Sequence, residues 1–226
     1  MKIKKIKEAY RRNLPHIQPI GAAFFVTFRL KDSIPKAKIW ELKQAFESKV
    51  DAIKISDTLT KDVRIYEERK RFFAQYDALL DSMKYGPTFL KQPAIAKIVA
   101  DEIHRFDKEF YELLAYSIMP NHVHILIDTH IQIPKIFDIS KWASLEFEPL
   151  STIMKRIKGP SAIYTNRLLD RSGKVWQRES YDHYIRHVQE LNRVIAYILN
   201  NPVKAGLVEQ WEDHPFTFLA APRNES

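Results

Sequence analysis

The chain has 226 residues, 45% of them hydrophobic, which is enough for one domain with a sizeable apolar core. It contains no cysteine, which excludes thiol catalysis, disulfides and cysteine-bound zinc and is compatible with a reducing cytoplasm. The formal net charge of +8 favours an acidic partner such as nucleic acid, and no stretch approaches the ~20 apolar residues of a membrane span.

The first predicted element is a strand over residues 23–30, where Phe24, Val26, Phe28 and Leu30 alternate onto one face. Apolar periodicity then predicts three helices over residues 38–55, 61–83 and 93–106. A shorter crossover would connect two strands, so the span from about 34 to 107 is an enlarged helical insert. Its charges are nearly balanced, which favours solvated helices packed on the sheet over a contact with DNA or a protein partner.

Two further strands are predicted over residues 111–119 and 122–128, joined by a Pro-Asn turn. Because strand side chains alternate, His122 and His124 share one face, while Val123 and Ile125 can bury on the other. Two imidazoles side by side on one rigid strand suit a metal ion. The alternative is a pair of half-buried histidines held by ordinary hydrogen bonds.

Residues 129–149 are predicted to form a loop, and residues 150–169 a basic helix. Positive charge is concentrated at the N-terminus, over residues 1–12, and again over residues 150–178. The second block has Asp170 as its only acidic residue, and we predict that its cations bind DNA phosphates. These cations are Lys155, Arg156, Lys158, Arg167, Arg171, Lys174 and Arg178.

A short strand is predicted within residues 175–186, followed by an amphipathic helix over 188–201 that we expect Pro202 to end. At ~100° per residue, Tyr197 points ~140° away from the centre of the apolar stripe. Asn201 lies one turn further along the same side. Tyr197 is therefore either a surface tyrosine or a nucleophilic phenol with a polar metal ligand beside it.

Counting the insert as one helical connection, the order is strand, helix, strand, strand, helix, strand. This order predicts an α+β fold, the ferredoxin-like split βαβ antiparallel sheet.

Three motifs together resemble the REP-associated tyrosine transposases, a branch of the single-tyrosine HUH nucleases. These motifs are MPNHVHIL, VWQRESYDHYIR and YILNNPVKAGLV, in the order in which that family carries them. The resemblance covers residues 14–30 and about 110–216, and it implies one HUH transposase-like domain over 1–226 with the insert at about 34–107. It also implies the same fold, with the histidine strand central and the tyrosine helix packed over it.

The resemblance implies a site as well as a fold. His122, His124 and Asn201 would hold a divalent ion, Mg²⁺ or Mn²⁺, and Tyr197 would be the nucleophile that forms a 5′-phosphotyrosine. Tyr181 and Tyr184 compete for that role but lack a polar partner one helical turn away. The implied partner is single-stranded or hairpin DNA in a bacterial cytoplasm, at the nucleoid and not at a membrane, bound by a monomer or a homodimer.

Two other functions remain compatible with the residues. One is a DNA-binding protein without cleavage activity, against which the intact histidines, tyrosine and asparagine argue. The other is a histidine-metal hydrolase of small phosphoesters, which would need neither the +8 charge nor a basic helix.

Overall fold

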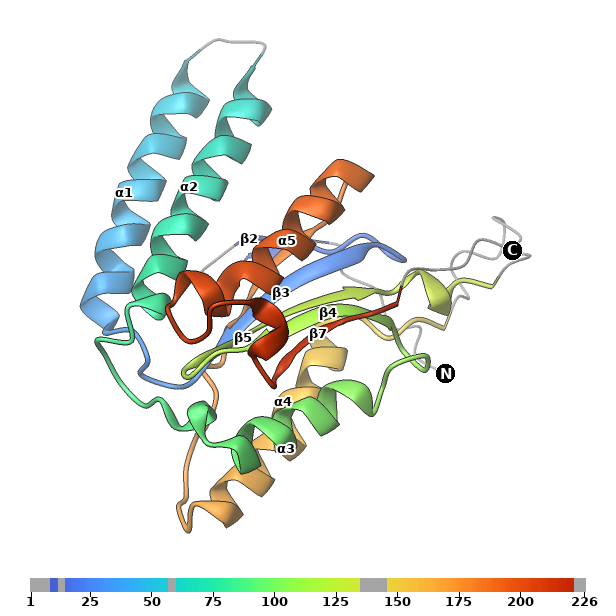
Figure 1. Ribbon diagram of the computed structural model, residues 1–226. Helices are drawn as coiled ribbons and strands as arrows, with labels where there is room; N and C mark the ends of the chain where they lie inside the picture. Colours follow the sequence, from blue (N-terminus) through green and yellow to red (C-terminus); the bar gives the residue numbers. More distant parts are fainter. Residues whose placement is uncertain (1–8, 12–14, 57–59, 135–145, 222–226) are drawn as a thin grey trace.

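A five-stranded antiparallel sheet separates two helical layers in the computed structural model, which describes residues 9–11, 15–56, 60–134 and 146–221 (Figure 1). The sheet order is β6-β3-β5-β4-β7. Its strands are β3 (Ala23–Arg29), β4 (Glu112–Ile118), β5 (His122–Asp128), β6 (Tyr181–Tyr184) and β7 (Thr217–Leu219).

The predicted α+β fold is confirmed. Without β7, the strand order is that of the split βαβ sheet, with the last strand beside the first and the third strand between the first and the second. The histidine strand β5 is central, since β3 and β4 pair with its two edges. The additional strand β7, which the sequence did not predict, extends the sheet beyond β4.

One face of the sheet is covered by α3 (Pro93–His104) and α4 (Leu150–Leu168) (Figure 1). Alternation directs Val123 and Ile125 of β5 to this face, as predicted, where they join the main core. Trp176 packs edge-on against Phe28, and its indole nitrogen donates to Ser161 Oγ at 3.0 Å. The basic helix is therefore a core helix with one solvated face.

The other face is covered by α5 (Val188–Lys204) and is flanked by a projecting hairpin of α1 (Lys36–Ile55) and α2 (Lys61–Asp81) (Figure 1). Since α3 serves as the crossover helix of the split βαβ unit, the α1–α2 hairpin is the part of the insert that exceeds it. None of the described helices combines the length and apolarity that a membrane span requires.

The prediction that Pro202 ends the tyrosine helix is wrong, because α5 continues to Lys204. A proline in the last turn removes one backbone donor but does not stop the turn from closing. Ala205 caps the helix, and Gly206 follows it with a left-handed φ of +68°. The N–H groups of Gly206 and Leu207 donate to the carbonyls of Val203 and Pro202 in a Schellman motif.

The remaining elements are short. β1 (Ala9–Arg11) pairs with β2 (Pro15–Ile17), and the described residues also include the 3₁₀ turns η1 (Phe89–Lys91), η2 (His130–Gln132) and η4 (Trp211–Asp213). Residues 1–8 of the N-terminal basic block and residues 135–145 of the predicted loop lie outside the described residues.

Candidate active site

The histidine pair, His122 and His124, converges on one point beneath α5. The two Nε2 atoms are 2.9 Å apart, and both side chains are fully buried. The register of the sheet sets this geometry, since Thr27 lies opposite His124 in β3 and Thr27 Oγ1 contacts His124 Nδ1 at 2.8 Å. Each ring is therefore anchored at Nδ1 and presents Nε2, the arrangement of a histidine that binds a metal ion.

Asn121 determines which nitrogen of His122 carries the proton. Its Nδ2 donates to the Leu80 carbonyl at 2.9 Å, so its Oδ1 faces His122 Nδ1 at 2.6 Å. An amide oxygen only accepts, so His122 must donate from Nδ1 and its Nε2 carries a lone pair. The same side chain also ties the histidine strand to the end of α2.

The sequence predicted burial for the Val123 and Ile125 face of β5, and the structure buries the histidine face as well. Both faces are buried, because α2 and α5 cover the histidine pair. Asp77 of α2 brings Oδ1 to 3.4 Å from His124 Nε2, and Asp81 brings Oδ1 to 3.8 Å from His122 Nε2. Asp77, His122 and His124 each offer a ligand atom, and these three atoms lie within 4.8 Å of one another.

Tyr197 points into this site and not away from the core. Its ring packs edge-on against Phe25 and lies 5.4 Å from the His124 ring, centroid to centroid. Its hydroxyl donates a hydrogen bond to Asp77 Oδ2. Sequence periodicity placed Tyr197 off the apolar stripe of α5, but its half-buried ring packs on the same apolar cluster as Leu191 and Ile195, beside the histidines.

Asn201 is buried one turn beyond Tyr197, and neither of its side-chain polar atoms has a hydrogen-bond partner. Oδ1 of Asp77 and Oδ1 of Asp81 are likewise buried without a hydrogen-bond partner. Buried polar atoms are ordinarily paired, so unpaired carboxylate oxygens beside the Nε2 atoms of the two imidazoles are a donor set that a divalent cation would satisfy. The residues present therefore fit the expected metal ion.

Burial dominates the electrostatics of the site. It lowers the pKa of His122 well below its usual value, with help from His124, and it lowers the pKa of His124 to about 3. Both imidazoles are thus neutral at neutral pH, which is the form that binds metal ions. Burial and the adjacent Asp77 carboxylate raise the pKa of Tyr197, which keeps the phenol protonated in this arrangement.

The two competing tyrosines, Tyr181 and Tyr184, point to opposite faces of the sheet because side chains alternate along β6. Tyr184 packs toward the main core on the α3–α4 face, away from the histidine pair. Tyr181 lies on the histidine face, but its ring stacks on Phe73 at 4.3 Å between centroids. Of the three tyrosines, Tyr197 is the one whose hydroxyl contacts the Asp77 carboxylate beside the histidines.

Known proteins resemble this chain in sequence and in fold. A Haemophilus influenzae protein named "Putative REP-associated tyrosine transposase" is 28% identical over 143 residues, covering 59% of this chain and 77% of its own length. The chain resembles the REP-associated tyrosine transposases. A solved structure of such a transposase bound to a REP hairpin matches with a TM-score of 0.50 and 17% identity. That match covers 92% of this chain and 80% of the solved chain, and it supports the fold. No protein-family model matches.

The predicted DNA-binding residues lie apart from this transposase-like site. α4 packs on the sheet face opposite the histidine pair, and most of its predicted cations are exposed. Lys158 differs, because its Nζ donates to the Gln177 carbonyl at 2.8 Å and to Ser180 Oγ at 3.0 Å. Burial, with a smaller effect of Arg29, lowers the pKa of Lys158 to about 8. Its ammonium holds the chain before β6 in place.

Sequence reasoning missed Asp77 and Asp81, which come from the insert. A signal was present, since carboxylates four residues apart share a helix face, and Phe73 and Leu80 mark that face as covered. Nothing in local periodicity, however, shows that this face meets the histidine strand.

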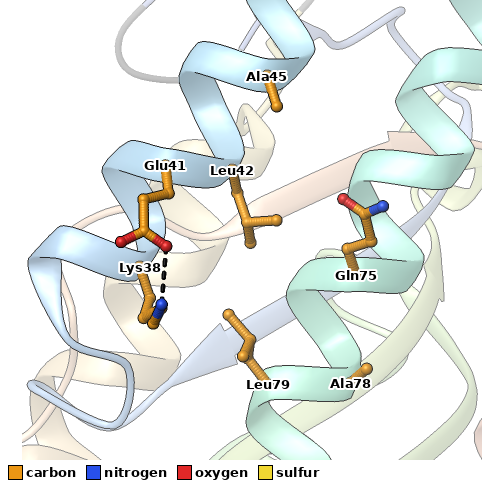
Figure 2. Close-up of a pocket in the computed structure, with 7 residues that line it drawn as sticks. All are labelled: Lys38, Glu41, Leu42, Ala45, Gln75, Ala78 and Leu79. Carbon is orange, nitrogen blue, oxygen red and sulfur yellow. Dashed lines mark hydrogen bonds and ion pairs between the residues drawn. The ribbon is translucent and has the colours of Figure 1, made fainter.

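A groove between α1 and α2 lies away from the candidate active site. Figure 2 shows its lining of Lys38, Glu41, Leu42, Ala45, Gln75, Ala78 and Leu79, with Lys38 paired to Glu41. Gln75 and Leu79 lie about 160° around α2 from Asp77, so the groove is on the far side of that helix.

Proposed function

We propose that this chain is a metal-dependent endonuclease and strand transferase that acts on single-stranded or hairpin DNA through a 5′-phosphotyrosine. The observation that carries the proposal is the placement of the Tyr197 phenol beside two buried, neutral imidazoles. Asn201, one turn away, adds a buried amide without a hydrogen-bond partner. We regard residues 1–226 as one transposase-like domain.

The proposed cation ligands are His122, His124 and Asn201, with Mg²⁺ or Mn²⁺ as the ion. When bound, such an ion supplies Lewis-acid polarisation of a phosphate oxygen. The Tyr197 oxygen attacks the phosphorus, the phosphorus–O3′ bond breaks, and the 3′ oxygen leaves with a proton. The bond energy is retained in the phosphotyrosine, so a second 3′-hydroxyl can displace the tyrosine without a nucleotide cofactor.

The substrate class rests on charge and on similarity. The net charge of +8 and the exposed cations of α4 suit a polyanion, and the similar solved transposase is bound to a REP hairpin. A small phosphoester would use the site alone and would leave the basic helix without a purpose. The proposed setting is the bacterial nucleoid, where such DNA is found.

The test is incubation with an end-labelled DNA hairpin and Mn²⁺, followed by a denaturing gel. We expect a labelled protein–DNA band when the label is on the fragment 3′ to the nick, and no band with EDTA. His122→Ala and His124→Ala should lose this band while still binding the hairpin. Hairpin binding without any adduct would favour the alternative, a DNA-binding protein that does not cleave.

A further inference from the structure

The candidate site is largely enclosed. His122 and His124 are 0% exposed, Asp77 and Asn201 are 1% exposed, and Tyr197 is half-buried. In-line attack requires the Tyr197 oxygen to reach the phosphorus within the backbone of a DNA strand. In this structure that oxygen is hydrogen-bonded to the Asp77 carboxylate of α2, which a strand would have to displace.

The closure is made by one face of α2 along one face of α5. Three polar contacts run in the same order along both helices. Tyr66 donates to Glu190, Tyr197 donates to Asp77, and Lys204 donates to Asp81 at 2.8 Å. Phe73 lies between the first two contacts, 6.0 Å from the Tyr197 ring. The contact between α2 and α5 is therefore polar and aromatic, and it is not an aliphatic core.

Two of these contacts involve groups that a DNA phosphate would need. The Tyr197 hydroxyl and the Lys204 ammonium both donate to carboxylates of α2. The same carboxylates, Asp77 and Asp81, also face the Nε2 atoms of the histidine pair. An anionic phosphate oxygen requires the same donors and the same approach, so the two carboxylates stand where the phosphate would bind.

The α1–α2 hairpin is built to remain folded when it separates from α5. Its base has its own apolar cluster of Ile34, Tyr76 and Leu80, distinct from the clusters of the sheet. Phe46 and Phe72 also pack within the hairpin, 5.1 Å apart. The segment before α1 and the segment after α2 lie against each other. A Cβ added to Gly86 would lie only 2.2 Å from the Asp32 carbonyl oxygen. At this end the base is bonded to the sheet side, since Arg29 Nε donates to the Tyr76 hydroxyl and Asn121 Nδ2 donates to the Leu80 carbonyl. The hairpin is thus joined to the sheet at one end.

We propose that the α1–α2 hairpin is a gate whose Asp77 and Asp81 occupy the phosphate position until a DNA strand displaces them. This inference rests on the proposed function. The strand's phosphates would take over the Tyr197 and Lys204 donors, and α2 would move away from α5. The insert then makes cleavage conditional on a strand that binds strongly enough to displace the carboxylates.

The absence of cysteine allows a direct test, since a bismaleimide would react at introduced thiols. The test pair is Tyr66→Cys in α2 with Arg186→Cys, and the two introduced thiols are cross-linked. The two positions are close, since the Arg186 guanidinium lies 4.3 Å from the centre of the Tyr66 ring. The control is Lys49→Cys with Glu68→Cys, an ion-paired position that links α1 to α2 within the hairpin.

The cross-link between position 66 of α2 and position 186 should abolish the adduct with the DNA hairpin. The control cross-link between α1 and α2 should leave the rate of adduct formation unchanged. Equal adduct rates in both cross-linked proteins would overturn the gate and leave the proposed function standing. If neither unlinked double variant forms an adduct with Mn²⁺, the proposed function fails, and the gate fails with it.

A second variant tests the gate without a cross-link. Asp81→Asn removes a partly exposed ion pair with Lys204, so the adduct rate at limiting DNA should rise about two- to fivefold. Asp101→Asn, which removes the Lys97 ion pair on α3, should change nothing. A rate that stays the same or falls in Asp81→Asn would contradict the gate.

Discussion

At the residue scale, the tautomer of His122 is set by the neighbouring Asn121, whose side chain does not titrate. Asn121 accepts from His122 Nδ1 and donates to the Leu80 carbonyl, so its amide is fixed in one orientation. The imidazole then has one tautomer, with its Nε2 lone pair facing His124. Asn121 is a positioning residue, since it acts through the histidine.

Asn121→Ala should therefore weaken Mn²⁺ binding by about 10- to 100-fold, as loss of a partner behind a metal-binding histidine generally does. Asn121→Asp should retain most of the affinity, because a carboxylate oxygen still accepts from Nδ1. Isothermal titration with Mn²⁺ measures the affinity, and nitrogen NMR of the imidazole reports the tautomer. Equal affinity and an unchanged tautomer in the alanine variant would remove the positioning role.

At the element scale, α5 is held at its N-terminus by Glu190. Its carboxylate accepts from Tyr66, from His183 Nε2 at 2.9 Å and from the Arg186 N–H at 2.9 Å. Burial alone would raise the pKa of Glu190, but these hydrogen bonds lower it to about 2. One side chain therefore joins α2, β6 and α5.

Glu190→Gln should lower the free energy of unfolding at neutral pH by about 1–3 kcal/mol, since the hydrogen bonds involve a charged acceptor. A depressed carboxyl pKa stabilises the fold above the unfolded-state value of ~4.3, and that contribution is lost as pH falls toward 2. Urea unfolding between pH 7 and pH 2 should show the two proteins converging in acid. A constant difference across that range would mean that the charge of Glu190 is not responsible.

The elements themselves were largely predictable. Residues 122–128 form the predicted strand, and the helix predicted over residues 61–83 is observed as α2, Lys61–Asp81. Local periodicity carries that information. It does not carry the approach of α2 to the histidine strand, so Asp77 and the contact of Tyr197 with it were missed. The prediction that Pro202 ends α5 was wrong because a proline is tolerated in the last turn of a helix.

At the scale of the whole molecule, the candidate site and the basic helix lie on opposite faces of one sheet. A DNA hairpin that uses both must therefore pass around the sheet edge. The sequence predicted both features, but not their separation, because which face each helix covers is decided by the strand order.

Replacing Lys155, Arg167 and Lys174 with glutamate should weaken binding to every DNA sequence and flatten its salt dependence. Each lost phosphate contact removes up to ~0.7 from the log–log slope on single strands. Fluorescence anisotropy over a salt series measures the slope. Replacing Lys38, Lys49 and Lys54 of α1 makes the same change of charge and should leave the slope near the wild-type value. Equal slopes in the two triple variants would show that α4 is merely solvated.

The central claim is that Tyr197 becomes covalently attached to DNA, and peptide mapping of the adduct tests it most directly. Wild-type protein is incubated with a DNA hairpin and Mn²⁺, digested, and the nucleotide-bearing peptide is sequenced by mass spectrometry. We predict attachment at Tyr197, no adduct in Tyr197→Phe, and an adduct still formed by Tyr184→Phe, whose ring faces the other side of the sheet. Attachment at Tyr181 or Tyr184, or an undiminished adduct in Tyr197→Phe, would contradict the account.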